Sequence, residues 1–599
     1  MKNYKLLLTG LALVAGFFLF GATTNSFATG LMVWGKPPAN IHEFTGLPLD
    51  INGWTDFRYM IKEQNLYQDA RVVFVSSSEG NDATGSIYSV DDLVFNENGV
   101  FQSAGPVNPY QTLAGGAKQL RDGYPDIMLL KRGDEWVETL PVGNRSGRSV
   151  TERAIYSSYG NNSARPVLRP VGNIMSTMRA SYLIFANLHF YAAHKDPGHS
   201  NYQSSEQSGS EIRWVGGGHD ILVEDVHSDY IGWVVQGWSN DDKPAEFHNV
   251  AFRRCFTEKN YILPGGPHAQ GIWTSYVYGL LLEDSTWYQN GWRADIPETA
   301  TTFNRNLYLS HTNEGVVFRN NFSIMSATSG IQMRSGGDAF GNVISHCTSG
   351  IQQGVNHEAR PAGLIANSAY NVILAMRYGT SGNHSVDAYG HGFRYNSVSE
   401  GYALENIVAN SLYPKVGFYA DDHDPNDGAY SMFRNFDFEK NIVYNHGRES
   451  IYLAEIGSNT LSNIKLIDNE LENQVDDSVL IRSTAPMSAI SMSKGNKYWS
   501  NRVDYKWLTS GATTMTLAEW GDTLDPKDTT SVADNPNYSD PDRSLATYAA
   551  SLGYDETLEA FVDELRKQQR PNWRDEFTAR AAINYIRAGF GRGPIPEDY

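Results

Sequence analysis

Cysteine is almost absent from this chain, because only Cys255 and Cys347 occur in its 599 residues. Two cysteines are too few for a disulfide scaffold or for a metal site built from thiolates. Positive charge is also scarce: 48 lysines and arginines face 67 aspartates and glutamates, which gives a formal net charge of −19. Nucleic acids and anionic membranes attract concentrated basic surfaces, so we expect neither as a partner.

Long apolar runs are missing beyond the first residues. No later segment reaches the roughly 18 to 20 apolar residues that a membrane span requires. The apolar stretch 6–20 follows Lys2 and Lys5 and precedes Ser26 and Ala28, a pattern typical of a secretory signal that is cut after Ala28. We therefore expect a signal peptide over 1–28, no membrane anchor, and a secreted or periplasmic monomer.

Short apolar segments recur along the chain, each followed by Asn, Asp or Gly, and they begin at residues 221, 250, 280, 316, 341 and 363. A second column pairs a glycine with apolar or aromatic residues, at Gly232, Gly271, Gly291, Gly330 and Gly350. Its intervals of 39, 20, 39 and 20 residues are typical of coils of a parallel β-helix that sometimes carry an extra loop. Because stacked coils superpose equivalent residues about 4.8 Å apart, we expect an asparagine ladder. Its predicted members are Asn321, Asn342, Asn367, Asn406 and Asn441.

These repeats, together with the entry segments 72–85, 109–114 and 127–134, resemble the right-handed parallel β-helix proteins of the pectate-lyase-like superfamily, which act on polysaccharides. The resemblance covers residues 70 to 500 and implies an all-β solenoid fold. We expect an N-terminal segment and cap over 29–125, the β-helix over 126–510 and a C-terminal helical cap over 511–599. A short helix over 112–121 should plug the first coil, and Asp555 and Asn572 can cap two later amphipathic helices.

Outward-facing residues of such a solenoid define the first candidate site. If the glycine column is in register, one face carries, in order, Trp273, Arg293, Gln332 and Gln352. β-Elimination on a uronate polymer needs a group that neutralises the sugar carboxylate, a base for the α-proton and an acid for the leaving oxygen. We assign these roles to Arg334 with Gln332, to His311 and to Tyr308, respectively. His268, on a loop beside Trp273, is a further candidate for substrate contact.

The segment 421–424 defines a second candidate site. Its Asp-Asp-His-Asp sequence is similar to the Asp-Pro-His-Asp signature of alginate C5-epimerases, which are also right-handed β-helices. The resemblance implies that Asp421 and His423 are the acid and base of proton exchange, although Asp422 replaces the proline and the neighbouring Tyr419 is displaced by one residue. Alternatively, the segment is a solvated acidic loop, or a Ca²⁺ loop with Asp421, Asp424 and Asp427 as ligands. We expect no other cofactor.

Four functions stay open at this point. A polysaccharide lyase is the leading hypothesis, and a C5-epimerase shares its first step, removal of the C5 proton. A glycoside hydrolase needs two carboxylates that flank a sugar, and the candidates are Asp295, Glu298, Glu314 and Asp338. A non-catalytic carbohydrate-binding solenoid would instead present stacking platforms, with Trp233, Trp273 and Trp292 as candidates. In every case Cys255 and Cys347 should lie three coils apart, about 14 Å, and stay unbonded.

Overall fold

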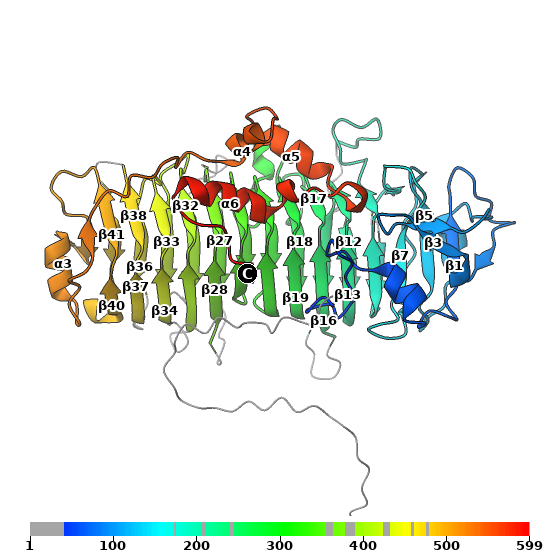
Figure 1. Cartoon of the computed structure of the whole chain (residues 1–599), viewed down its shortest axis with the longest axis horizontal. Coiled ribbons are helices and arrows are strands. Elements are labelled where there is room, and N and C mark those ends of the chain that lie inside the picture. Colours follow the sequence, from blue (N-terminus) through cyan, green and yellow to red (C-terminus); the bar gives the residue numbers. More distant parts are fainter. Residues whose placement is uncertain are drawn as a thin grey trace, which may run out of the picture.

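The computed structural model describes residues 41–172, 175–204, 211–238, 245–354, 363–377, 390–422, 432–456, 461–474 and 478–597. The expected signal peptide, His423, Asp424 and Asp427 lie outside this range. Three long sheets of mostly parallel strands run side by side along the molecule (Figure 1). Each coil of the chain contributes one strand to each sheet in turn, for example β13, β14 and β15. The predicted parallel β-helix is confirmed.

Sheet I comprises β1 (Val72–Val75), β5 (Ile127–Lys131), β7 (Ala154–Tyr159), β10 (Leu183–Ala186), β13 (Gly218–Glu224), β16 (Phe247–Arg253), β19 (Val277–Glu283), β22 (Glu314–Arg319), β25 (Gly337–Phe340), β28 (Ile365–Ala369), β31 (Glu400–Leu404), β34 (Phe433–Glu439), β37 (Leu461–Ile467) and β40 (Ile490–Lys494), with the short β2 (Ile87–Tyr88), β3 (Leu93–Phe95) and β4 (Phe101–Ser103). Sheet II comprises β6 (Glu135–Trp136), β8 (Val167–Leu168), β11 (His189–Tyr191), β14 (His227–Asp229), β17 (Phe256–Glu258), β20 (Thr286–Tyr288), β23 (Phe322–Ile324), β26 (Val343–Ser345), β29 (Val372–Leu374), β32 (Ile407–Ala409), β35 (Ile442–Tyr444), β38 (Glu470–Asn473), β41 (Lys497–Ser500) and β44 (Val532–Ala533). Sheet III comprises β9 (Met175–Met178), β12 (Glu211–Val215), β15 (Gly232–Gln236), β18 (Gln270–Ser275), β21 (Arg305–Leu309), β24 (Ser329–Met333), β27 (Ser349–Gly354), β30 (His391–Asn396), β33 (Val416–Asp421), β36 (Ile451–Ala454), β39 (Ile481–Ser483), β42 (Leu508–Ser510) and β43 (Thr513–Met515).

The interior of the solenoid is a continuous stack of apolar side chains. Ile331 lies beside Ile351 in adjacent strands of sheet III, as the 20-residue interval predicts. The same inward column contains, from coil to coil, the buried residues Ile272, Leu307, Ile331, Ile351, Phe393 and Phe418. Burial of each such side chain stabilises the fold by about 1.5 to 3 kcal/mol, so the inward pattern fixes the register.

An asparagine ladder occupies the turn between sheets I and II. The backbone N–H of each rung donates to the side-chain oxygen of the next rung, and the backbone N–H of Ser285 donates to the first. The donor–acceptor distance is 3.0–3.1 Å for the bonds between Ser285 and Asn469, and 2.9 Å for the last bond, from Asn469 to Asn496. The rungs are Asn321, Asn342, Asn371, Asn406, Asn441, Asn469 and Asn496. The prediction was wrong at Asn367, which lies within β28 and donates outside the ladder to Asp338. Asn371 takes its place, since the turn begins only after the strand ends.

Separate elements close the two ends of the solenoid. α1 (Leu113–Ala117), which begins after the capping side chain of Thr112, packs Leu113 and Ala117 into the core at the first coils, as the predicted plug does. β1 precedes it and already pairs in parallel with β5, so the solenoid includes a strand upstream of residue 126. At the other end, α3 (Leu517–Thr523) buries Trp520 in the same core.

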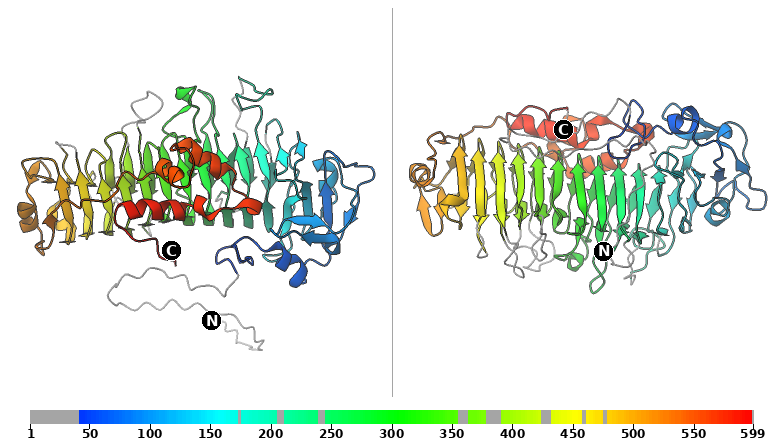
Figure 2. Two further views of the ribbon diagram at one scale, coloured as in Figure 1. Left: turned by 45° about the horizontal axis from the view of Figure 1, so that its top comes forward. Right: turned by 90° about the horizontal axis from the view of Figure 1, so that it is seen from below.

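The chain then reverses direction, in what we call the return segment (residues 534–597). It contains α4 (Leu545–Ser551), α5 (Leu558–Arg566) and α6 (Ala579–Gly589), with Thr557 and Thr578 as the caps of α5 and α6 instead of Asp555 and Asn572. The helices lie along the side of the solenoid and not over its end (Figures 1 and 2). They pack on the outward apolar residues of sheet II, from Phe256 to Tyr444. The expected fold-back is present, but it covers a flank.

Shorter elements complete the described chain: η1 (Tyr59–Glu63), η2 (Val90–Asp92), η3 (Pro297–Thr299), η4 (Met487–Ala489), η5 (Arg570–Asn572) and η6 (Asp575–Phe577). The N-terminal segment packs Phe57, Met60 and Tyr67 on the outer face of sheet I. Cys255 and Cys347 are both free and buried, as predicted. Among the described residues, no helix has the length and hydrophobicity that a membrane span requires.

Candidate functional site

A single outward row of side chains runs along sheet III, and it contains four of the predicted site residues, Trp273, Tyr308, Gln332 and Gln352. Strand pairing places, from coil to coil, Trp273, Tyr308, Gln332, Gln352, Arg394, Tyr419, Tyr452 and Arg482 in one line. Seven intervals of about 4.8 Å make the line about 34 Å long. All eight side chains are partly exposed, while their neighbours in the strand point into the core. Tyr419, beside the second candidate site, therefore lies on the same face as Tyr308 and Gln332 of the first.

Tyr308 and Arg334 form the centre of the first candidate site. The Arg334 Nη1 donates to the Tyr308 hydroxyl at 2.9 Å, across two adjacent coils. A second guanidinium, that of Arg305, lies 5.1 Å from the centre of the Tyr308 ring. His311 follows β21, and its Nδ1 lies 3.2 Å from the Ser310 hydroxyl. The four residues assigned to β-elimination thus come from two neighbouring coils.

His268 and Trp273 flank this centre on the preceding coil. Trp273 lies beside Tyr308 in the row, where its exposed ring can stack on a sugar. His268 precedes β18 and stacks on Phe303 at 4.6 Å between ring centres. Burial, followed by the nearby Arg305 charge, lowers the pKa of His268, so its imidazole is neutral at neutral pH.

Arg293 does not belong to the row, which corrects the predicted column. Gly291 is not followed directly by a strand of sheet III. In the column of paired strands, the residue that lies between Gly271 and Gly330 is Asn306. The reason is a loop inserted after β20, which delays the next strand to Arg305. Arg293 lies in that loop, nearly buried, and donates to Asp295 at 2.9 Å and to the Tyr202 hydroxyl at 2.7 Å. Tyr308 takes its place beside Trp273.

Arg394, Tyr419 and Asp421 form the described part of the second candidate site. The Asp421 carboxylate is fully buried, accepts from Arg394 at 3.1 Å and is hydrogen-bonded to Asn396 on the neighbouring strand. Burial, and then the Asp421 charge, raises the pKa of Tyr419, so this phenol keeps its proton at neutral pH. Asp421 thereby orients Arg394 and is not itself exposed at the surface of the row.

The predicted partners His423, Asp424 and Asp427 lie outside the described residues, so their positions relative to Asp421 are not part of the structure. Both Asp421 oxygens are already engaged by Arg394 and Asn396. The Asp421 carboxylate therefore already has one cationic partner, whose positive charge would repel a Ca²⁺ ion at the same carboxylate.

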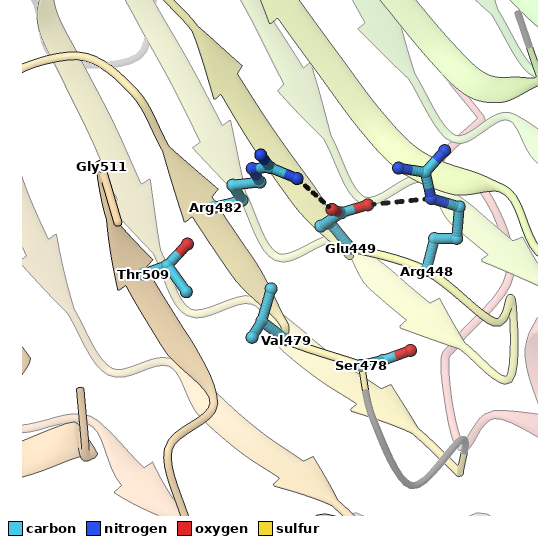
Figure 3. A pocket seen from close by; sticks show the side chains of 7 residues that line it. All are labelled: Arg448, Glu449, Ser478, Val479, Arg482, Thr509 and Gly511. Carbon is cyan, nitrogen blue, oxygen red and sulfur yellow. Dashed lines mark hydrogen bonds and ion pairs between the residues drawn. The ribbon is translucent and has the colours of Figure 1, made fainter. Parts of the chain in front are cut away.

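The row ends in an open depression of about 400 Å³ beyond Tyr452 (Figure 3). Arg482, which is in the row beside Thr509, forms one wall. The Glu449 carboxylate lies between two arginines, at 3.3 Å from both Arg482 Nη1 and Arg448 Nε. Arg482 also lies 4.9 Å from the centre of the Tyr452 ring. This end of the row is therefore lined by two guanidinium groups.

The row carries several arginines although the chain is acidic. It carries Arg394 and Arg482, with Arg334 beside it, and Arg213 continues it on an earlier strand. The nearby carboxylates of Glu211, Asp421 and Glu449 each form an ion pair with one of these arginines. An anionic ligand therefore encounters arginine side chains along this face, in a protein whose formal net charge is −19.

The residues offered for a hydrolase or a stacking platform are dispersed. Glu314 and Asp338 lie in β22 and β25 of sheet I, on another face from the loop that carries Asp295 and Glu298. Trp233 is a core residue that is 1% exposed, and Trp292 is buried with its indole N–H donating to Met325. Of the three tryptophans, Trp273 alone is partly exposed in the row, because the other two are buried inside the protein.

Sequence reasoning missed Arg394, Tyr452 and Arg482. A signal for the first was present, since Gly392 precedes Phe393 and Arg394 as Gly330 precedes Ile331 and Gln332. This signal was not recognised because segments of different length separate β27 from β30 and β33 from β36, so the glycines do not recur at a regular interval in the sequence.

The fold and this row define a parallel β-helix protein with an extended row of partly exposed aromatic, amide and arginine side chains on one face. No protein-family model matches the chain, and no curated protein has a similar sequence.

Solved structures with a similar fold include a mannuronic acid specific polysaccharide family 6 lyase from human gut microbiota, with 10% identity and a TM-score of 0.44 over 79% of this chain and 95% of that one. The A-module of a mannuronan C-5 epimerase of Azotobacter vinelandii has 12% identity and a TM-score of 0.37, over 64% and 90%. A lacto-N-biosidase from Eubacterium ramulus has 12% identity and a TM-score of 0.34, over 79% and 68%. These likenesses concern the architecture only.

Proposed function

We propose that the chain binds an acidic polysaccharide along the outward row of sheet III and cleaves it by β-elimination. The observation that carries this proposal is the row itself: aromatic, amide and guanidinium side chains repeat at the coil spacing over about 34 Å. Such a row suits a long ligand with a repeating unit. Aromatic rings stack on sugar faces, and arginines bind carboxylates through two parallel hydrogen bonds.

The reaction centre of this proposal is Tyr308, Arg334 and His311. Arg334 binds the uronate carboxylate and so acidifies the C5 proton. His311 removes that proton, and the electron pair forms a double bond between C4 and C5 while the bond from C4 to the glycosidic oxygen breaks. Tyr308 donates its proton to the leaving oxygen. The hydrogen bond from Arg334 to the Tyr308 oxygen supports this role, because it stabilises the phenolate that remains.

A C5-epimerase shares the proton abstraction and differs only in the fate of the carbanion, which is reprotonated from the opposite face. One experiment separates these activities. The purified protein is incubated with alginate, pectate and other uronate polymers, and three signals are followed: ultraviolet absorbance of the unsaturated product, deuterium incorporation at C5, and new reducing ends. A lyase raises the absorbance, an epimerase only exchanges deuterium, and a hydrolase produces reducing ends without the chromophore. A protein that binds polymer without any of these signals contradicts the proposed catalysis.

Variants then locate the centre. Loss of a general acid or base costs about 10²- to 10⁴-fold in rate, so Tyr308→Phe and His311→Ala should lower kcat by at least about 100-fold with little change in KM. Arg334→Lys should retain more activity than Arg334→Ala, because lysine keeps the positive charge although it cannot form the bidentate hydrogen bonds of arginine. Arg434→Ala, an exposed arginine on sheet I, is the matched control and should be fully active. If His311→Ala is active while His423→Ala is dead, the centre lies at the 421–424 segment instead.

A further inference from the structure

A cluster of potential metal-ligating side chains lies on sheet II, away from the outward row of sheet III. His189 and His227 stand beside each other in β11 and β14, and Asp229 lies two residues after His227 on the same outward face. Each residue offers one ligand atom, and these three atoms lie within 4.8 Å of one another. Of the residues that the structure describes, these are the only three of the His, Cys, Asp and Glu types that come together in this way.

The cluster interrupts an otherwise apolar surface. In the coils that follow, the outward positions of sheet II are largely occupied by residues such as Phe322, Val343 and Ile407, which the return segment covers. The histidines lie at the edge of this covered surface, and all three members of the cluster are partly exposed. The cluster therefore lies close to the protein surface. Packing alone gives no reason for two imidazoles and a carboxylate at this edge.

Two ligand atoms of the cluster are buried and lack a hydrogen-bond partner. These atoms are the Nε2 of His189 and the Oδ1 of Asp229. A buried polar atom left unsatisfied costs about 1 to 3 kcal/mol, and such groups in native proteins usually bind water or an ion. The imidazole rings of His189 and His227 are stacked, 4.5 Å apart at 9°, so one ring has to rotate before both in-plane nitrogen lone pairs can point at a single ion.

The surroundings match the usual outer shell of a metal site. A metal-bound histidine usually directs its second nitrogen to a carboxylate, which fixes the ring. His227 Nε2 lies 3.1 Å from Glu258 Oε1, and Glu258 is held by Arg566 of the return segment at 2.8 Å. The nearby cations are already paired: Arg566 and Lys259 with Glu258, and Arg165 with Asp225.

We propose that His189, His227 and Asp229 bind one divalent transition-metal ion of the Zn²⁺ type, which bridges two successive coils next to the point where the return segment docks. Two imidazoles and one carboxylate are a donor set that suits Zn²⁺ and leaves a position for water. Ca²⁺ and Mg²⁺ prefer all-oxygen ligands, so they should not compete.

The test uses the full-length protein without a histidine tag, stripped with a chelator and dialysed. Titration with Zn²⁺ in a calorimeter, checked by elemental analysis, should give one ion per chain. Zn²⁺ should also raise the melting temperature, and excess Ca²⁺ should not displace it. Co²⁺ should bind in the same place and give visible absorption bands of nitrogen and oxygen ligation.

The variants His189→Ala, His227→Ala and Asp229→Asn should each weaken Zn²⁺ binding at least about 10-fold. His248→Ala is the matched control, because that ring is half exposed on sheet I, and it should bind like the original protein. Asp229→Asn keeps the size of the side chain, and circular dichroism in chelator should show an unchanged fold. The inference is overturned if the unmodified protein binds no Zn²⁺, if Ca²⁺ displaces it, or if the folded Asp229→Asn variant binds as tightly.

Discussion

Replacing Asn406 by alanine tests the asparagine ladder, and with it the register of the whole solenoid. The Asn406 side chain is fully buried and makes four hydrogen bonds. Its oxygen accepts from the backbone and side-chain nitrogens of Asn371 at 3.0 and 2.9 Å, and its nitrogen donates to Ser368 and Asn441, both at 3.0 Å. Alanine removes all four and leaves buried partners without water.

At about 1 kcal/mol for each hydrogen bond, the loss in the free energy of unfolding should be about 4 kcal/mol. The matched control is Asn367→Ala, because Asn367 was the sequence-predicted rung and makes one side-chain bond, 2.9 Å to Asp338, at a partly exposed position. That variant should lose about 1 kcal/mol or less.

Both free energies come from urea unfolding followed by circular dichroism, with the slope of the transition compared between variants. A loss below about 1 kcal/mol in Asn406→Ala would refute the reasoning, since that is the value of one ordinary bond. Equal losses in the two variants would show that the ladder does not pass through residue 406 as described.

Two further predictions concern stability. Burial lowers the pKa of His446 from 6.5 to about 4. Between these two pH values the unfolded chain binds a proton at His446 that the folded chain does not bind. The free energy of unfolding should therefore fall as the pH drops from 6.5 to 4, by up to about 1.4 kcal/mol per pH unit. Urea unfolding at several pH values should show that slope reduced in His446→Gln, and an unchanged slope would contradict the cause. Arg570, nearly buried, donates to Asp50 at 2.8 Å and to backbone oxygens of Thr55 and Asn98. Arg570→Ala should lose about 3 to 5 kcal/mol and make residues 534–597 sensitive to a protease in the folded state, whereas the exposed Arg434→Ala should do neither.

The sequence is sufficient to predict the solenoid wherever coils have no inserted loop. Between Ile331 and Ile351, or Asn321 and Asn342, the chain advances one coil with a nearly constant number of residues, so spacing and register agree. The prediction fails where a loop changes that number. Arg293 was placed in the row because an insertion delays the true strand to Arg305, and Asn367 was placed on the ladder four residues before Asn371.

The site is harder to predict than the fold, because it depends on which side chains face outward in the same column. Tyr308, Gln332 and Gln352 follow from strand alternation once one strand is aligned. The sequence also contains a signal that His189 and His227 are neighbours. His189 lies five residues after Ile184, His227 lies five residues after Leu222, and Ile184 and Leu222 lie side by side in sheet I. The ion pair between Arg394 and Asp421 has no such signal, as it joins residues of two strands through side-chain geometry alone.

The contact of Arg570 with Asp50 joins residues 520 positions apart, which changes how the molecule comes apart and assembles. A stack of coils that touch only their neighbours can lose its terminal coils one at a time. The return segment spans most of the stack and is fastened near its first coils, so loosening either end also breaks contacts at the other. Forming so distant a contact is slow, because the loop must be closed before the contact stabilises it. Residues 534–597 should therefore dock last in refolding, and their docking should turn a gradual, coil-by-coil melting into one cooperative transition.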